Sequence, residues 1–563
     1  MIWKPLSFSI FCMTLLLIIA AGCIEPHDNS STLEPVSANH WQDMNNTLHT
    51  FVSIVDHEMD NITISVCNAA RELDGVPIDD PSVNLTLLKL RRDVPFSFDV
   101  CRVDKNNTLV AITGELQNQW MVGTCQMTHQ YTEEDFNTTN NECIITEFCT
   151  FQSGERGVMI IAPVYDVDGN YDGTLRLQLD VEYLFAGLVE YLRTEYGYTT
   201  WVVEKNGMKI YDEDTVEIGM NLTTNHLFQT NSTMSMVSNV LRNKSGNTSY
   251  IFYTTGWSDH TQINIVWDTV YPGYGAEWRI IVSDNVVQYT PEDRPQITSE
   301  ELKNFVQKAY AYVQRVGKEE ALAEFNDPNG DFINGELYIF AYDMNGTLLS
   351  LPYQPDLVGT NLWFMKDMSG VNPVQRAIAR AEQGGGYVYY LYLNPSMDYV
   401  KEFKLSYVMA VDNDWFIGSG IYLHEVPFSH TYNLNIENGG KLISQVRNMQ
   451  YLSKVENISS VVDMVEDPKS AVYIEGLYPF VLTENGTVLA YSRNPAIDDT
   501  NQLGKTNSYG MSGVREVISL AQAGGGMMYS LVWDSTTQHE NYVLIYVEPG
   551  DKSTYFGSML ILE

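Results

Sequence analysis

The sequence is poor in basic residues. Its 563 residues include 33 Lys and Arg against 71 Asp and Glu, for a formal net charge of −38. So acidic a surface repels phosphate backbones, which excludes nucleic acid as a partner, and it also excludes attachment to anionic lipid through basic patches alone. Charged residues make up only 18% of the chain and hydrophobic residues 44%, so the composition is that of a folded protein and not of a disordered one.

Catalytic and metal-binding motifs are also missing. The sequence contains no HExxH, GxSxG or GxxxxGK[ST] pattern, and its 10 His residues are scattered without metal-ligand spacing. Asp166, Asp168, Asn170 and Asp172 alternate like calcium ligands, but Tyr171 stands where an EF-hand loop needs glycine, so we expect a hairpin turn there. The sequence therefore predicts no enzyme, no metal site and no cofactor.

Long apolar runs are absent beyond the N-terminus. The one run near bilayer length, Leu6–Ala21, follows Lys4 and precedes Gly22-Cys23, and the small residues before Cys23 resemble a lipobox, the cleavage site of lipid-anchored proteins. We predict a signal peptide over residues 1–23, lipidation at Cys23 and a linker over 24–40. The protein would then be exported and anchored to the outer face of the cell membrane. An ordinary cleaved signal, or a leader that remains as the anchor, stays open.

Cysteine is scarce, and the five cysteines beyond the leader all lie in the first third of the chain: Cys67, Cys101, Cys125, Cys143 and Cys149. None has the CxxC spacing of a structural zinc site. In an oxidising compartment two disulfides with one thiol left over are plausible, and the pairing stays open. Acceptor triplets N-x-S/T recur from Asn29 to Asn485, as in an exported glycoprotein.

An internal repeat is present in the second half. ELYIFAYDMNGTLLS (336–350) matches GLYPFVLTENGTVLA (476–490), and AEQGGGYVYYLY (381–392) matches AQAGGGMMYSLV (521–532), both at an offset of 140 residues. The Asn-Gly pairs predict tight hairpin turns, and the triple glycines predict turns that enter a strand. Fainter copies of the hairpin stand at 96–112 and 199–211. The chain therefore contains about four units of antiparallel sheet.

Helices are predicted in front of these units. Apolar residues from His40 to Leu73 recur at helical spacing and indicate one long helix. Thr298 and Glu301 form a capping box before an apolar stripe, and a similar stripe begins at Leu442. The predicted fold class is α+β: tandem PAS-like antiparallel sheets with long leading helices, in about four lobes.

These features resemble Cache domains, the extracellular PAS-like sensor modules of prokaryotic receptors. The resemblance rests on the hairpin followed by Leu357-Val358-Gly359-Thr360-Asn361, on Lys366–Gly370, on the Gly384–Gly386 turn and on the strand Trp415–Tyr422. It implies two single Cache domains, at 298–426 and, more divergent, at 437–563. A double Cache domain is expected at 41–297, with a distal lobe at about 75–185 and a proximal lobe at about 190–290.

The resemblance implies a sensor of small molecules, such as organic acids, that signals through a separate receptor or transporter. Lysine and tyrosine side chains in a sheltered cup can fix a carboxylate while aromatic rings bury its carbon skeleton. In the third unit the candidates are Tyr338, Tyr342, Trp363, Lys366, Tyr387, Tyr389, Lys404 and Tyr407. Many single Cache domains carry His-Pro where this chain has Leu351-Pro352, and this departure leaves open the alternative of a surface interaction protein that uses Cache lobes as scaffold without a ligand.

Overall fold

The computed structural model describes most of the chain beyond the leader. The described residues are 33, 35–113, 130–137, 143–151, 155–196, 198–253, 260–284, 297–334, 336–367, 369–394, 400–423, 436–534, 538–550 and 553–562. The predicted signal peptide, Cys23 and Cys125 lie outside them. Helices and antiparallel sheets alternate along the chain, and the prediction of an α+β fold is confirmed.

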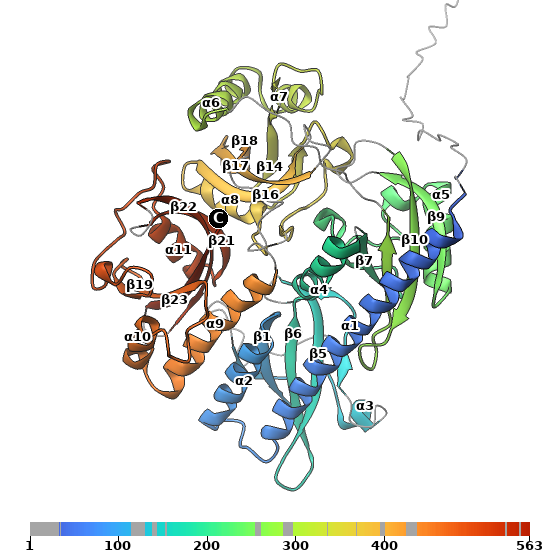
Figure 1. Cartoon of the computed structure of the whole chain (residues 1–563), viewed down its shortest axis with the longest axis vertical. Coiled ribbons are helices and arrows are strands. Elements are labelled where there is room, and N and C mark those ends of the chain that lie inside the picture. The colour runs from blue at the N-terminus through green and yellow to red at the C-terminus, as the bar shows by residue number, and fades with distance from the viewer. Residues whose placement is uncertain are drawn as a thin grey trace, which may run out of the picture.

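Four large sheets are arranged around a common centre, with the first at the bottom of Figure 1, the second at the right, the third at the top and the fourth at the left. In each sheet the first two strands form a hairpin, the last strand pairs with the first, and the middle strands follow outward. The orders are β2-β1-β6-β5-β3, β8-β7-β11-β10-β9, β15-β14-β18-β17-β16 and β20-β19-β23-β22-β21. The same plan is thus used four times.

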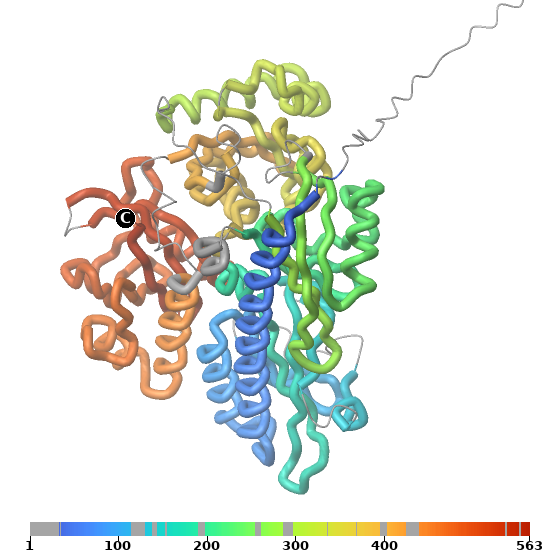
Figure 2. Tube along the Cα trace, turned by 45° about the vertical axis from the view of Figure 1, so that its right-hand side comes forward, coloured from blue at the N-terminus to red at the C-terminus, as the bar shows by residue number. Residues whose placement is uncertain are grey.

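The first sheet is preceded by a long helix. α1 (Ala38–Glu72) starts behind Ser37, whose side chain accepts the backbone N–H of His40. The helix buries a stripe from Met44 to Val66 against the first two sheets, and it runs lengthwise beside both in Figure 2. The other elements of this unit are α2 (Pro81–Asp93), β1 (Ser97–Asp104), β2 (Leu109–Ile112), α3 (Glu133–Asn137), β3 (Ile144–Ile145), β4 (Cys149–Thr150), β5 (Arg156–Tyr165) and β6 (Tyr171–Leu179). The predicted turn at Asp166–Asn170 joins β5 to β6: the Asp166 carboxylate accepts the N–H groups of Asp168 and Asn170.

The second sheet begins after α4 (Val181–Tyr196), which lies near the centre of the molecule. Its strands are β7 (Thr199–Glu204), β8 (Lys209–Asp212), β9 (Gly246–Tyr253), β10 (His260–Val270) and β11 (Trp278–Ser283), with η2 (Thr215–Glu217), η3 (His226–Phe228) and α5 (Asn231–Arg242) between β8 and β9.

The third unit starts with α6 (Ser299–Val316), for which the predicted capping box is present: Glu301 donates its N–H to the Thr298 hydroxyl, and Thr298 donates its own to the Glu301 carboxylate. The remaining elements are α7 (Lys318–Phe325), β12 (Ile333–Asn334), β13 (Leu337–Tyr338), β14 (Phe340–Asp343), β15 (Leu348–Ser350), η4 (Pro355–Leu357), α8 (Pro373–Glu382), β16 (Gly386–Asn394), β17 (Val400–Ala410) and β18 (Trp415–Tyr422). β12 and β13 form a separate two-stranded sheet.

The fourth unit repeats the third. Its elements are α9 (Ile436–Val455), α10 (Ile458–Glu466), β19 (Leu477–Thr483), β20 (Val488–Tyr491), η7 (Pro495–Ile497), α11 (Gly513–Gln522), β21 (Gly526–Asp534), β22 (His539–Pro549) and β23 (Thr554–Ile561). The triple glycines make the predicted turns: all three have positive φ at the end of α8, and all three have it at the end of α11. A Cβ at Gly525 would lie 2.5 Å from the Val547 carbonyl oxygen, so the turn needs glycine there.

One asparagine contact relates the last three units. The side chains of Asn221, Asn361 and Asn501 donate to the carbonyl oxygens of Asn206, Asn345 and Asn485 at 3.1, 2.8 and 2.6 Å. Each accepting residue precedes the glycine of its hairpin, and that glycine has φ near +86° in all three. The contact ties the segment after the hairpin to the turn itself, and it extends the repeat of the second half into the second unit.

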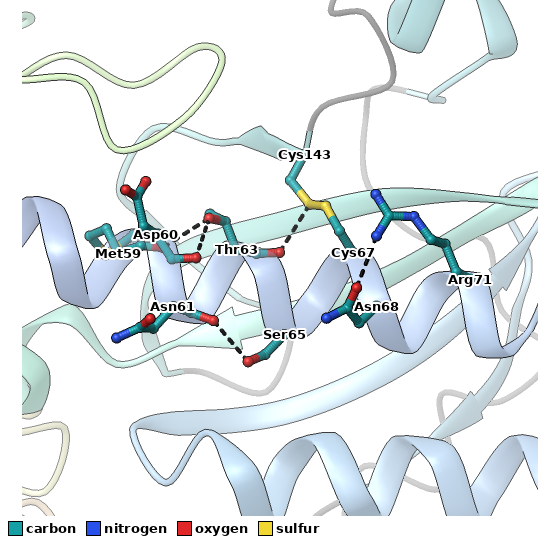
Figure 3. Close-up of a disulfide and its surroundings, with 9 residues drawn as sticks. All are labelled: Met59, Asp60, Asn61, Thr63, Ser65, Cys67, Asn68, Arg71 and Cys143. Atoms are coloured by element: carbon teal, nitrogen blue, oxygen red, sulfur yellow. Dashed lines mark hydrogen bonds between the residues drawn. A yellow bond between two sulfur atoms is a disulfide. The ribbon is translucent and has the colours of Figure 1, made fainter.

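A disulfide between Cys67 and Cys143 joins α1 to the chain just before β3, with the two Cα atoms 6.6 Å apart (Figure 3). It closes a separation of 76 residues and so restricts the unfolded chain. Cys101 and Cys149 are free. Of the two disulfides expected, one lies among the described residues.

No helix among the described residues has the length and apolar composition needed to span a bilayer.

The four sheets share their cores. One cluster of buried apolar residues contains Val203 of the second sheet and Tyr342 of the third, and another contains Tyr389 of the third and Tyr529 of the fourth. The units therefore pack against one another through apolar contacts, so a shift of side chains in one unit alters the packing of the unit beside it.

Candidate ligand-binding site

A small cup lies between the third sheet and α8. Its lining is aromatic and aliphatic apart from one lysine, and it consists of Tyr338, Phe340, Tyr342, Leu351, Met365, Pro373, Val374, Ala377, Tyr390, Tyr392 and Lys404. The cup has a volume of about 20 Å³, which is room for about one water molecule. Leu351, which stands where the resemblance places a ligand-binding histidine, is among the lining residues.

Lys404 brings the charge to this cup. Its side chain is 1% exposed, and its ammonium donates to the Tyr338 hydroxyl at 2.8 Å and to the Tyr422 hydroxyl at 3.2 Å. The rings of Tyr338, Tyr422 and Tyr392 surround the nitrogen with centroids at 4.4, 4.7 and 5.2 Å. Their negative faces partly replace the water that a buried ammonium has lost.

The charge of Lys404 is not balanced by an ion pair. Within the described part of the chain, no carboxylate lies within 4.0 Å of Nζ, and two of the three N–H groups are used by neutral hydroxyls. Burial lowers the pKa of Lys404 to about 7, although the negative charge of Glu336 acts in the opposite direction. Burial also raises the pKa of the Tyr338 and Tyr422 hydroxyls, which therefore stay neutral. The third N–H has no hydrogen-bond acceptor among the described residues.

The cup contains three of the eight residues that the sequence suggested: Tyr338, Tyr342 and Lys404. Trp363 packs beside the same core cluster, and its carbonyl oxygen accepts hydrogen bonds from the side chains of Asn372 and Gln375. It positions the start of α8 and does not line the cup.

Tyr387, Tyr389 and Tyr407 lie on the opposite face of the third sheet. Tyr387 donates its hydroxyl to the carbonyl oxygen of Ser299 at the start of α6, and its ring packs on Tyr407. Tyr389 packs against Tyr509 and Tyr542 of the fourth unit. Tyr387 and Tyr389 thus pack against the fourth unit, Tyr407 packs on Tyr387 within the third, and none of the three lines the cup.

Lys366 serves a contact between units. Its ammonium forms an ion pair with Asp180, the residue before α4, at 2.7 Å. Burial lowers the pKa of Lys366, but the charges of Asp180, Glu155 and Glu182 outweigh this effect and raise it. Lys366 therefore carries its charge toward the first unit.

Sequence reasoning missed the two tyrosines of β16 that do line the cup. Tyr390 faces Lys404 across the β16–β17 pairing, and its hydroxyl contacts Ser406 Oγ at 2.8 Å. Tyr392 donates to Gln354 at 3.2 Å. The register could have identified them, because Tyr390 is directly opposite Lys404 and so shares its face of the sheet, and Tyr392, two positions further along the strand, shares the face of Tyr390.

Comparison with known proteins finds one family model that matches part of the chain. A Cache domain family model matches residues 279–550, mainly the region of the third and fourth sheets, for which two single Cache domains were predicted. A search of curated proteins found no match. Among solved structures, an extracellular ligand binding receptor from Desulfohalobium retbaense DSM5692 is 16% identical with a TM-score of 0.35, over 43% of this chain and 40% of that receptor.

Two further solved structures are similar over short or divergent stretches. A methyl-accepting chemotaxis protein from Vibrio parahaemolyticus RIMD 2210633 is 26% identical with a TM-score of 0.21, over 22% of this chain and 88% of that one. The ligand binding domain of the Pseudomonas aeruginosa PAO1 amino acid chemoreceptors PctB in complex with L-Gln is 12% identical with a TM-score of 0.32, over 47% and 97%. The family match, together with the four sheets of one plan, supports a Cache domain protein.

Proposed function

We propose that this protein is an exported, membrane-anchored binding protein that senses a small organic acid in the cup of the third unit. The observation that carries the proposal is Lys404, a buried ammonium that has one N–H without an acceptor and no carboxylate partner among the described residues. A carboxylate that entered the cup would complete its hydrogen bonds in a low dielectric, where such a bond is strong. The Cys67–Cys143 disulfide supports an oxidising compartment and hence export.

The size of the cup fixes how a ligand would act. With room for about one water molecule, it accepts an organic acid only if a lining side chain moves. Tyr390 and Tyr392 lie on β16, whose other face carries Tyr389 against Tyr509 of the fourth unit. A ligand that moves β16 would thereby alter the packing between the third and fourth units. A separate membrane receptor or transporter that binds one arrangement of the units more tightly would respond to this change.

Anion binding at Lys404 should depend on pH. We expect formate and acetate to raise the unfolding temperature at pH 6, and their affinity to fall by about 30-fold between pH 6 and pH 8.5, because the ligand needs the protonated amine and its pKa is about 7. Calorimetric titration at both pH values measures this change. Affinity that is equal at both would contradict the role of Lys404.

Substitution at Lys404 provides the matched test. Lys404→Met keeps the length of the side chain and removes the charge, and we expect it to weaken acetate binding roughly 10- to 100-fold. Lys469→Met, at an exposed lysine of the fourth unit, should leave binding unchanged. If the wild-type protein gives no response to either acid at pH 6, the result favours the alternative, an interaction protein that uses its Cache lobes as scaffold. The small volume of the cup also supports that alternative.

A further inference from the structure

A second cavity of the described chain is larger than the cup. It has a volume of about 240 Å³ and lies where the first, third and fourth units meet. Its walls come from the start of β1 and from Tyr183 on α4, from α8, and from α9, β22 and the turn at Gly524–Gly526. The glycines leave their part of the wall without side chains. The space corresponds to roughly eight water molecules, enough for a small metabolite.

The basic residues that line this cavity differ in one respect. Arg91 and Arg447 both hydrogen bond to the Glu548 carboxylate, and Lys366 pairs with Asp180. Arg376 is paired more weakly, through one long ion pair with Glu516. Within the described part of the chain, its guanidinium contacts Glu516 Oε2 at 3.8 Å and Met528 Sδ at 4.0 Å, and no oxygen atom lies within hydrogen-bond distance.

The position of Arg376 explains its incomplete pairing. Arg376 on α8 and Glu516 on α11 occupy the same place in the 140-residue repeat, and they face each other where the third and fourth units meet. Glu516, however, is hydrogen bonded to Arg380, which lies one turn further along α8. The carboxylate is therefore engaged elsewhere, and Arg376 keeps a charge whose planar N–H groups fit two oxygen atoms of one anion.

A residue outside the third unit also lines the cavity. Tyr183 lies on α4, and its hydroxyl is buried against Gly439 of α9 without a hydrogen bond among the described residues. Arg376 and Tyr183 come from different units, so a molecule that contacts both would join the third unit to the first.

We propose that this junction cavity is a second binding site, separate from the cup, for a small metabolite that carries an oxyanion. Arg376 would hold the carboxylate or phosphate through paired N–H groups, and Tyr183 would pack against the same molecule. Glu155 also lines the cavity, and burial raises the pKa of its carboxyl group, so this wall repels an anion less than an ordinary carboxylate would. Because three units form the walls, an occupied site would fix their relative positions.

The test uses succinate and inorganic phosphate as the carboxylate and phosphate probes on the full exported chain. We expect at least one of them to raise the unfolding temperature of the wild type, and Arg376→Gln to weaken its binding roughly 10- to 100-fold. Arg376→Lys should restore only part of the affinity, because an ammonium is not bidentate. Arg315→Gln, at an exposed arginine of α6, is the matched control and should change nothing.

Glu516→Gln gives a test of opposite sign. Removing the acidic charge 3.8 Å from Arg376 should tighten the binding of the same probe, by roughly 3- to 10-fold, since a competing charge is lost. Lys404→Met should leave this site unchanged, which separates it from the cup.

Two results would overturn the proposal. One is that neither probe binds to the wild type, and the other is binding that Arg376→Gln and Glu516→Gln both leave unaltered, as for anions held weakly on the surface. Failure of acetate at the cup with success of succinate or phosphate here would reject the cup alone.

Discussion

Replacing Glu548 by glutamine is expected to lower the free energy of unfolding by about 3 to 5 kcal/mol, the cost of leaving a buried charge without its partner. The Glu548 side chain is 2% exposed and accepts from Arg91 at 2.6 and 2.9 Å. Arg447 donates to the same carboxylate at 3.1 Å. Glutamine keeps the shape of the side chain but leaves two buried guanidinium groups without a counter-charge.

The same substitution should loosen the contact between the first and fourth units. Arg91 lies on α2 of the first unit, whereas Arg447 on α9 and Glu548 on β22 belong to the fourth. Arg447 also donates to the carbonyl oxygens of Pro95 and Ser97 at 2.9 and 2.6 Å. We therefore expect Glu548→Gln to expose the start of β1 to proteolysis before the sheets themselves unfold.

Urea unfolding of the wild type and of Glu548→Gln measures the loss, with Glu484→Gln at an exposed glutamate as the control. Burial alone would raise the pKa of Glu548, but Arg91 and Arg447 outweigh it and hold the pKa at about 2. The unfolded state therefore binds the extra proton between about pH 4.5 and pH 2. The stability that Glu548 contributes is present above this range and is lost as the pH falls through it. A loss below 1 kcal/mol, or an acid profile that the variant shares with the wild type, would contradict this account.

Features fixed by short stretches of backbone could be predicted from the sequence. Asn345-Gly346 predicts its hairpin because glycine supplies the positive φ that the turn needs, and the structure gives +86°. Thr298 and Glu301 predict the start of α6 for a similar reason, since both partners of the cap lie within one helical turn. Each of these signals is complete within a few residues, so no knowledge of the fold is required.

The face of a strand was harder to assign. Lys404 and Tyr407 are three positions apart on β17, so in a regular strand they point to opposite faces, and both were predicted to line one pocket. The same parity places Tyr387 and Tyr389 away from the cup and Tyr390 in it. The face of the sheet on which a side chain lies depends on the pairing register of its strand. The register of β16 with β17 is known from the structure and could not be derived from the sequence.

Contacts between units could not be predicted at all. Arg91 and Glu548 are 457 residues apart, and nothing around either residue indicates the other. The partner of Lys366, Asp180, is 186 residues away in the first unit. The junction cavity depends on such contacts between distant residues, and of the predicted site residues only Lys366 lines it.

Lys404→Met is expected to raise the free energy of unfolding by about 1 to 4 kcal/mol at pH 6, the range observed when buried charges are replaced by apolar side chains of similar volume. The folded-state pKa of Lys404 is about 7, below the ordinary value near 10.4, so folding forces a protonated amine into a poor environment. The cost is complete below pH 7. It shrinks as the pH rises and vanishes near the ordinary pKa.

The wild type should therefore gain stability relative to Lys404→Met between pH 7 and pH 10, by about 1.4 kcal/mol per pH unit at most. Urea unfolding of both proteins at pH 6 and at pH 9.5 measures how far their free energies of unfolding converge. A variant that is less stable than the wild type at pH 6 would contradict this account, because the tyrosine rings would then already stabilise the ammonium fully. If the convergence is found, Lys404 makes the free fold less stable while it supplies the charge for acetate. Methionine would make the core more stable than lysine does. If the same variant also loses acetate binding, lysine is explained at this position by binding, at a cost in the free energy of unfolding.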